Sequence, residues 1–430
     1  MTGTEVAVPR IVILGAGYAG IDAYKALARR LGSRLRRGEV QVTVVNPDPY
    51  HTFHGWTGEV LSGRLPLSAA LTPLAPLFRW ARVVLGHAAH VDLVARTVTV
   101  QAADGQTRTL PYDQLLIGTG SADPFARVPG LREHGWKLKN TRDMQLFRDH
   151  LHGWLSGRAT APEPGRILVV GGGFAGVEMA AAICELVDAR RVAVETELYT
   201  SAPHLLEALR PHQSRLADHA AGELGRLGVK VRTGAGVREI TPRGVVLSSG
   251  EVQEFGLVLY TAGVSYDVLL GTEALQRDER GRLVVEDDLR LPGHPEVWAA
   301  GDTARVPLPR DRRELCPANA LWAMKQGMCV GNNMAAALKG QPGRPFAYGG
   351  LGQAASLRVG GGVAELKGLP LTGWTGWLMR LGFFVWYMPT KEGGVRVLRA
   401  WAGSLSGRRH LGAVPEPRTE ATGGAELSRS

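Results

Sequence analysis

The sequence predicts an α/β protein built from two similar parallel-sheet units, and three observations lead to this fold class. Two glycine-rich segments of the pattern G-x-G-x-x-G lie far apart, at residues 15–20 and 171–176. Each follows an aliphatic run typical of a buried parallel strand, at residues 11–14 and 167–170. Each also precedes a helical stretch rich in small residues. This order of strand, glycine turn and helix starts a βαβ unit.

The glycines gain their meaning from this context, because 56 glycines in 430 residues give about one match by chance. In each segment the first glycine allows a tight turn, the second lets a pyrophosphate approach the backbone, and the third lets helix and strand pack closely. The free N–H groups of the helix then face the phosphates. The expected cofactor-binding residues are Gly15, Gly17, Tyr18, Ala19 and Gly20, and then Gly171, Gly173, Phe174, Ala175 and Gly176. We predict two Rossmann-like dinucleotide sites, although either segment alone also fits an ordinary βαβ turn.

Composition excludes several classes of protein. The chain is long enough for two or three globular domains, at 44% hydrophobic and 21% charged residues. Its net charge is +10, but no basic stripe interleaved with aromatics occurs in the N-terminal half, so nucleic-acid binding is not expected. Three widely spaced cysteines favour a reducing compartment, the N-terminus has no signal-peptide pattern, and the histidines show no metal-ligand spacing.

The first unit contains further candidate residues. Residues 29–37 are basic and are expected to form a solvated loop before a strand at residues 40–45. Asn46 ends that strand, where an Asp or Glu usually bonds the adenosine ribose, and an Asn can make the same bonds more weakly. A later strand runs into a glycine turn at Thr119 and Gly120. We expect Asn46, Thr119 and Gly120 to contact a cofactor.

The second unit repeats this plan after a linker at residues 158–165, which is rich in Pro and small residues. Thr200 follows its second strand, and Gly263 lies in the turn after its last strand. Beyond it comes an Ala-Gly-Asp segment with Gly301 and Asp302. These four residues complete the expected cofactor-binding set, Gly301 and Asp302 through the family resemblance given next.

With these motifs in this order, the sequence resembles the two-dinucleotide-binding flavoproteins, and most closely the type II NADH dehydrogenases, which are single-subunit NADH:quinone oxidoreductases. The resemblance spans about residues 10–410. It implies non-covalent FAD at the first segment and NADH or NADPH, as co-substrate, at the second. It also implies an FAD-binding domain of residues 10–158 and 265–350 and an inserted NAD(P)H-binding domain of residues 159–264. Asp302 resembles the family's aspartate that holds the ribityl chain of FAD.

The resemblance also implies the reaction, which is hydride transfer from NAD(P)H to FAD and then electron delivery to a quinone. The cofactor supplies this chemistry. Glu178 lies where the family carries a glutamate near the flavin and the nicotinamide, so we expect it to act in catalysis. A carboxylate in the first turn of a helix is also favoured by the helix dipole alone, and that alternative stays open.

The sequence departs from the family at two places. The family's quinone-site helix carries the pattern A-Q-x-A-x-Q, and here Leu321 and Lys325 replace both glutamines. Lys325 offers a cation that suits an anionic flavin or acceptor oxygen, so it is the second expected catalytic residue. Thr200 stands where NADH-preferring members place an acid, which leaves NADPH open, with Arg190 or Arg191 as candidate partners of its 2′-phosphate. A non-quinone acceptor and a redox-sensing protein with little turnover are the alternatives.

Residues 351–412 are expected to form an amphipathic, aromatic membrane-docking segment. Residues 371–389 are dense in Trp, Phe and Tyr, carry Arg380 as their only charge, and resemble the family's docking region. Their glycines and this charge favour lying in the interface with anionic lipid over spanning it. The alternative is a hydrophobic helix packed on the FAD domain or on a homodimer partner. We expect a peripheral protein at the cytoplasmic face of the membrane, or else a cytoplasmic one, with a disordered tail at residues 413–430.

Overall fold

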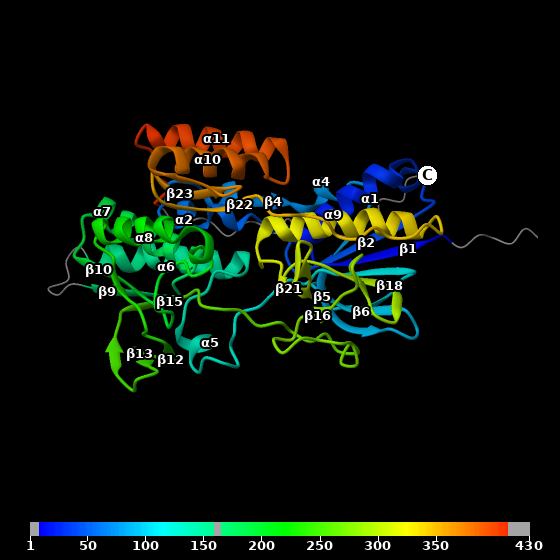
Figure 1. Cartoon of the computed structure of the whole chain (residues 1–430), viewed down its shortest axis with the longest axis horizontal. Helices are drawn as coiled ribbons and strands as arrows, with labels where there is room; N and C mark the ends of the chain where they lie inside the picture. Colours follow the sequence, from blue (N-terminus) through cyan, green and yellow to red (C-terminus); the bar gives the residue numbers. More distant parts are fainter. Residues whose placement is uncertain (1–7, 159–164, 412–430) are drawn as a thin grey trace, which may run out of the picture.

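The computed structural model describes residues 8–158 and 165–411. The tail expected at residues 413–430 and most of the linker expected at residues 158–165 lie outside the described residues. Figure 1 shows two α/β bodies side by side, with the C-terminal sheet and helices lying across one face. The α/β class predicted from the two glycine segments is confirmed.

The larger sheet carries the first glycine segment. Its strands are β1 (Arg10–Leu14), β2 (Gln41–Asn46), β5 (Arg82–Asp92), β6 (Thr97–Ala102), β7 (Thr107–Pro111), β8 (Gln114–Ile117), β17 (Arg290–Leu291) and β18 (His294–Ala299). They lie in the order β17-β18-β8-β1-β2-β5-β6-β7. The strands β2, β1, β8 and β18 run parallel. Strand β18, far along the chain, therefore joins the sheet that begins at β1.

Two long helices cover this sheet, α1 (Tyr18–Arg36) and α9 (Ala320–Ala337). They cross in close contact, because a Cβ at Gly327 would collide with the Ala19 carbonyl. The loop expected at residues 29–37 is wrong, since α1 continues to Arg36. Leu31 and Leu35 are buried and extend the apolar stripe of the helix, while Arg29, Arg30 and Arg36 are exposed.

The second glycine segment belongs to a smaller sheet. Its strands are β9 (Gly165–Val170), β10 (Val194–Tyr199), β11 (Lys230–Arg232) and β15 (Leu257–Tyr260). They run parallel in the order β11-β10-β9-β15. Its helices are α6 (Thr141–Arg158), α7 (Phe174–Arg190) and α8 (Arg210–Arg226), and a side sheet holds β12 (Val237–Thr241), β13 (Gly244–Leu247) and β14 (Val252–Glu254). The two glycine segments thus occupy equivalent places in two separate sheets.

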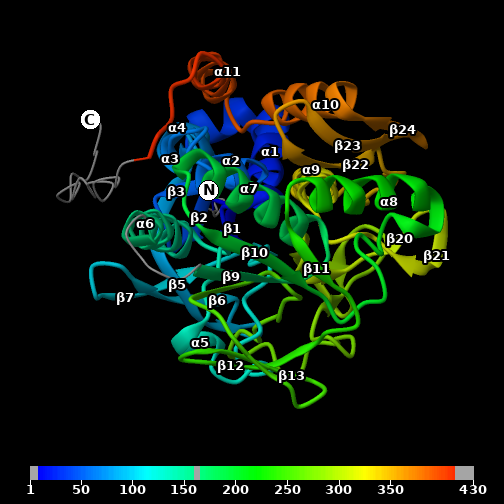
Figure 2. The same cartoon turned by 90° about the vertical axis from the view of Figure 1, so that its left-hand side faces the viewer.

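The C-terminal region is more than an aromatic helix. It starts with an antiparallel sheet of β22 (Gly352–Arg358), β23 (Gly361–Leu366) and β24 (Leu369–Thr372), and continues with α10 (Gly373–Trp386) and α11 (Lys391–Leu405). Figure 2 shows α10 over this sheet and α11 beside it. Trp377 and Trp401 are buried in one apolar cluster with Phe53 and Trp56 of the first unit. The region therefore shares a core with the rest of the chain.

Short elements complete the described chain. They are β3 (Tyr50–Thr52), β4 (Leu71–Pro73), β16 (Leu283–Val284), β19 (Ala304–Arg305), β20 (Pro307–Leu308), β21 (Asp311–Leu315), α2 (Thr57–Leu61), α3 (Leu67–Ala70), α4 (Leu74–Leu77), α5 (Leu131–His134) and a 3-10 turn (His54–Trp56). Within residues 8–158 and 165–411, no helix combines the length and apolar character that crossing a membrane requires.

Candidate functional site

A cavity of about 710 Å³ opens where β1 and β2 end. Among the residues expected from the sequence, those lining it are Gly15, Gly17, Tyr18, Ala19, Asn46, Thr119, Gly120, Gly301 and Asp302. The carboxyl ends of parallel strands are where ligands bind in such sheets. Residues more than 280 positions apart therefore meet at one site, because β18 returns beside β8.

The first glycine turn forms a cradle for an anion. Gly15 has φ +98, and a Cβ there would collide with the Gly118 carbonyl, so only glycine fits. Gly20 lies beneath the turn, where a Cβ would collide with the Gly15 carbonyl. A Cβ at Gly17, by contrast, would meet no atom within 4 Å, and no side chain caps α1 there. The free N–H groups at the start of α1 and this open space fit a dinucleotide diphosphate.

Asn46 serves the turn itself. Its Oδ1 accepts a hydrogen bond of 2.9 Å from the Ala16 N–H, and its Nδ2 donates to the Asp48 carbonyl over 2.7 Å. The side chain that the sequence assigned to the ribose therefore holds the glycine loop and the next turn. The carboxylate of Asp48 also lines the cavity, and burial raises its pKa. Sequence reasoning missed Asp48 because it lies two positions beyond the usual place.

The opposite part of the cavity is organised around Asp302. Its Oδ2 accepts from the Ser121 hydroxyl at 2.8 Å, and that hydroxyl oxygen accepts from Lys139 Nζ at 2.6 Å. The loop that carries Asp302 is fixed because the Gly301 N–H donates to Gln326 Oε1 at 2.8 Å. Gln326 is buried and follows directly after Lys325, so the substituted helix keeps one amide that acts on the site. Ser121, Lys139 and Gln326 were not foreseen.

Aromatic groups form one wall. The Tyr18 hydroxyl accepts from the His54 N–H at 3.0 Å, and its ring stands edge-on to His51 with centroids 4.8 Å apart. Burial lowers the pKa of His51 to about 3, so the ring is neutral. Its Nδ1 lies 3.1 Å from the Ala16 carbonyl and therefore carries the proton. Tyr18 and His51 thus form a rigid, uncharged wall beside the glycine loop.

The second glycine turn repeats the first in detail. Gly171 has φ +123, and a Cβ at Gly176 would collide with the Gly171 carbonyl. A Cβ at Gly173 would meet no atom within 4 Å, and α7 starts at Phe174 with Ala175 next. Thr200 Oγ1 accepts from the Ala202 N–H at 3.2 Å. This cradle also fits a diphosphate, and Gly263 turns the chain nearby with φ +74.

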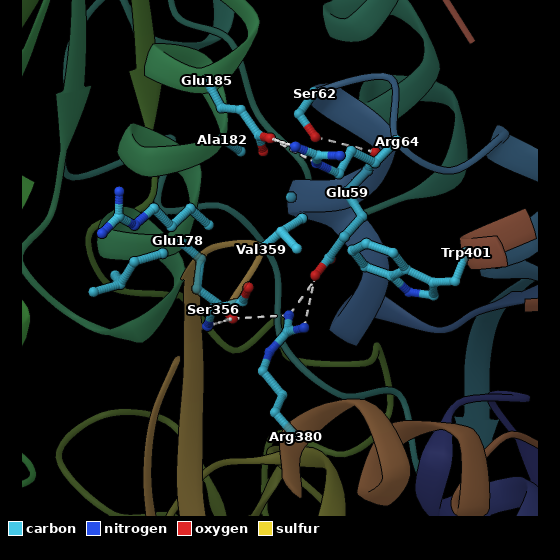
Figure 3. Close-up of a pocket in the computed structure, with 13 residues that line it drawn as sticks. Glu59, Ser62, Arg64, Glu178, Ala182, Glu185, Ser356, Val359, Arg380 and Trp401 are labelled. Carbon is cyan, nitrogen blue, oxygen red and sulfur yellow. Dashed lines mark hydrogen bonds and ion pairs between the residues drawn. The ribbon is translucent and has the colours of Figure 1, made fainter. Parts of the chain in front are cut away.

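Glu178 is not among the residues that line the large cavity, and it belongs to a buried ion-pair cluster (Figure 3). Its carboxylate is 2.8 Å from Arg380 Nη2 and accepts from the Ser356 N–H at 2.8 Å. Arg380 also donates to Glu59 Oε1 at 2.7 Å and to the Gly55 carbonyl at 2.7 Å. Burial raises the pKa of Glu178, while Arg380 opposes that shift. The catalytic role of Glu178 stays a prediction.

Lys325 also lies outside the lining of the large cavity. Its Nζ is 5.8 Å from the Tyr348 ring centroid and 6.0 Å from that of Tyr387, at the end of α10. Leu321 is buried in the apolar cluster with Phe53 and Trp377. The acceptor region named by the sequence is therefore aromatic and apolar, and the role of Lys325 stays a prediction.

The structure contradicts the placement of Arg190 near a 2′-phosphate. Arg190 ends α7, at the opposite end of the helix from the glycine turn, and donates to the Leu411 carbonyl at 3.1 Å. Arg191 follows it. The cation near Thr200 is Arg232, whose carbonyl accepts from the Thr200 N–H at 3.0 Å and whose guanidinium pairs with Glu251. Sequence spacing could not show that β11 ends beside β10.

The described residues include no group of three or more His, Cys, Asp or Glu arranged to hold a metal ion.

Comparisons with known proteins agree with this geometry. Residues 9–327 match the pyridine nucleotide-disulphide oxidoreductase family. The chain is 28% identical over 433 residues to the type II NADH:quinone oxidoreductase of Mycobacterium tuberculosis, covering 93% of this chain and 89% of the relative. It is 28% identical over 401 residues to the demethylphylloquinone reductase of Synechocystis, covering 91% and 95%.

A solved structure shares the fold. NDH2 from Plasmodium falciparum in complex with NADH superimposes with a TM-score of 0.78 at 14% identity, covering 94% of this chain and 100% of that chain. The resemblance to type II NADH dehydrogenases therefore extends from motifs to fold. The paired glycine cradles and the match over most of its length show that this chain belongs to the pyridine nucleotide-disulphide oxidoreductase family, as an oxidoreductase that works with FAD and a pyridine nucleotide.

Proposed function

We propose that the chain is an FAD-dependent NAD(P)H dehydrogenase that passes electrons to a quinone at a membrane surface. The observation that carries the proposal is the large cavity that joins the first glycine cradle to Asp302, with a second, separate cradle in the neighbouring sheet. We assign residues 10–158 and 265–350 to an FAD-binding domain and residues 159–264 to an NAD(P)H-binding domain. The return of β18 to the first sheet supports this division.

The residues of the cavity divide the work of holding FAD. The N–H groups at the start of α1 bind the diphosphate, and Asp48 lies where it can accept from ribose hydroxyls. Asp302 accepts from the ribityl chain, as the family resemblance implies, and Ser121 holds its carboxylate in place. Bound FAD supplies hydride acceptance and onward electron transfer. The protein excludes water around it with the neutral wall of Tyr18 and His51.

The choice of nucleotide follows from the end of β10. No acid stands at Thr200 to repel a 2′-phosphate, and Arg232 lies beside it with its charge engaged by Glu251. The relatives named above act on NADH or are named for their quinone substrates. We therefore propose NADH as the main co-substrate, with NADPH as the second.

A quinone acceptor is supported by the names of the relatives. Leu321 and Lys325 replace both amides of the family pattern, which favours a second candidate, a dehydrogenase with a non-quinone acceptor. The double change Leu321→Gln and Lys325→Gln tests the choice. We expect quinone turnover to rise about tenfold, which corresponds to about 1.4 kcal/mol. An unchanged quinone rate counts against this acceptor site.

Action at a membrane surface is supported by the outer side of the C-terminal helices, and the cytoplasmic face stays the side expected from the sequence. Trp374 and Trp386 are 59% and 82% exposed on α10, Leu398 and Leu405 are exposed on α11, and Arg399 is exposed between them. Large exposed apolar residues with basic neighbours suit an anionic lipid interface. The resemblance also supports a homodimer as the working form.

Surface substitution tests docking better than truncation, because Trp377 and Trp401 belong to the core. Flotation with vesicles of anionic lipid should recover the wild type, and Trp374→Ser with Trp386→Ser should abolish recovery. Val94→Ser is the control, since Val94 is 96% exposed and lies in the turn between β5 and β6, outside the C-terminal helices. Equal flotation of the wild type, the double Trp variant and the Val94→Ser control would contradict membrane docking.

An anaerobic titration tests the dehydrogenase itself. The purified protein is mixed with NADH or NADPH, and the flavin absorbance is followed before and after a quinone analogue is added. We expect fast bleaching by NADH and reoxidation by the quinone. A flavin that no pyridine nucleotide reduces on a catalytic timescale defeats the proposed function.

A further inference from the structure

The large cavity has a single permanent cation in its wall. Among the described residues that line it, Lys139 is the only lysine or arginine. Five carboxylates line the same cavity, and they are Asp48, Asp123, Asp143, Asp267 and Asp302. A cation in such surroundings would be expected to pair directly with a carboxylate.

Lys139 instead donates to a hydroxyl. Its Nζ donates to Ser121 Oγ at 2.6 Å, and the Ser121 hydroxyl donates its own hydrogen bond to Asp302 Oδ2 at 2.8 Å. Within the described residues, Lys139 has no carboxylate oxygen within 4 Å. An ammonium has three donors, so this arrangement aims the group while leaving donors for a ligand. Asp302 and Ser121 thus position Lys139 without neutralising it by contact.

The position of Lys139 indicates which part of FAD it meets. The diphosphate is served by the N–H groups of α1, and the ribose lies toward Asn46 and Asp48 after β2. Lys139 is tied to Asp302, which the family resemblance places at the ribityl chain. Beyond the ribityl chain lies the flavin ring. The cation therefore lies toward the ring end of the cavity.

Hydride transfer changes the charge at that end. NADH gives two electrons and one proton to the ring and leaves as NAD⁺, so the ring system gains one negative charge. A fixed cation stabilises charge that develops in a partly buried site. We propose that Lys139, aimed by Ser121, raises the reduction potential of the bound flavin and so favours its reduction. This inference rests on the proposed binding of FAD.

Substitution of Lys139 in the FAD-loaded protein tests the inference. The reduction potential is measured by equilibration with a reference dye and a chemical reductant, so NADH is not needed. A second readout is the dissociation constant of sulfite, an anion whose adduct with flavin gains negative charge. Lys139→Met should shift the potential to a more negative value and weaken sulfite binding about tenfold or more. Lys139→Arg should restore most of both properties.

Lys137→Met is the matched control. Lys137 lies two residues away and does not line the cavity itself; its Nζ stands 4.8 Å from the ring centroid of Phe125, which does. Its removal should leave the potential and sulfite binding unchanged. Should Lys139→Met fail to fold, Ser121→Ala provides the second variant, with a smaller shift in the same direction expected because the ammonium loses its orientation.

The outcomes separate this inference from the proposed function. An unchanged potential in a fully flavinated Lys139→Met protein overturns the role of Lys139. The role of Lys139 is also overturned if Lys139→Met lowers the flavin content while the flavin that stays bound keeps its reduction potential. Lys139 would then bind the diphosphate. A wild-type protein that holds flavin but is not reduced by NADH defeats only the dehydrogenase proposal. A wild-type protein that binds no flavin overturns both.

Discussion

The two glycine segments are nearly identical as turns and differ in what surrounds them. Gly15 and Gly171 both have positive φ, and both segments leave open space at the second glycine. The first faces a cavity of about 710 Å³ that reaches Asp302. The helix after the second carries Glu178, whose carboxylate is held by Arg380 from the C-terminal region. The motif therefore fits a phosphate cradle, and we propose that its neighbours decide whether the ligand is resident or exchanging.

The residues at the ends of β2 and β10, the second strands of the two units, also show that the surroundings of each turn matter. Asn46 bonds Ala16 and Asp48, and Thr200 bonds Ala202, so both side chains serve their own turns. Other groups stand close to each cradle instead, one from the turn directly after β2 and one from the end of the neighbouring strand β11. Asp48 does so at the first, and Arg232 at the second.

Removing Arg380, the cation that holds Glu178 near the second cradle, should cause the largest loss of stability among the changes proposed here. Arg380→Met leaves Glu59 and Glu178 buried without their partner, and breaking a buried pair costs about 3 to 5 kcal/mol. Urea unfolding measures this loss. Arg399→Met, on the exposed side of α11, should change the stability by less than about 0.5 kcal/mol. Equal stability of both variants contradicts a structural role for the cluster.

The wall of the first cavity should make the protein acid-sensitive. His51 has a folded-state pKa of about 3 against an ordinary value near 6.5, so the unfolded chain binds the extra proton as the pH falls. The contribution of neutral His51 to the free energy of unfolding is complete well above pH 6.5 and is lost progressively as the pH falls toward 3. At pH 5 the loss is about 2 kcal/mol.

The variant His51→Gln cannot titrate, and its amide can still donate to the Ala16 carbonyl. Urea unfolding at pH 7 and pH 5 should therefore show a smaller difference for His51→Gln than for the wild type. The same pH slope in both proteins rules out His51 as the source.

Nucleotide preference should show the smallest effect, at the second cradle. Glu251→Ala frees Arg232 for a 2′-phosphate and should raise the ratio of kcat/KM for NADPH over NADH about three- to tenfold. Arg232→Ala should lower the same ratio. If neither change moves it, Arg232 does not face the nucleotide.

The local turns were predictable from the sequence. Only glycine fits certain positions of such a turn, so the spacing of the glycines indicates the turn. The cavity lining at Gly15, Gly17 and Thr119 followed from the glycine turns, and that at Asp302 followed from the family resemblance. The extent of α1 was missed because arginines suggested a loop, whereas Leu31 and Leu35 continue its buried stripe.

Long-range pairing was not predictable. Nothing in the spacing shows that Ser121 links Lys139 to Asp302, or that Arg380 reaches Glu178, since these residues lie on separate segments. The antiparallel sheet β22-β23-β24 was not predicted either, because the aromatic residues of the C-terminal region indicated a membrane-docking segment.

The most direct test of the difference between the two cradles is a matched pair of substitutions, Gly17→Ala and Gly173→Ala. Neither added methyl group meets an atom of the protein within 4 Å, so both variants should fold normally. Flavin content and the KM for NADH are then measured in each. Gly17→Ala should lose FAD, whereas Gly173→Ala should keep FAD and raise the KM about tenfold or more. Loss of flavin from Gly173→Ala, or full flavin in Gly17→Ala, would contradict the assignment of a resident and an exchanging site.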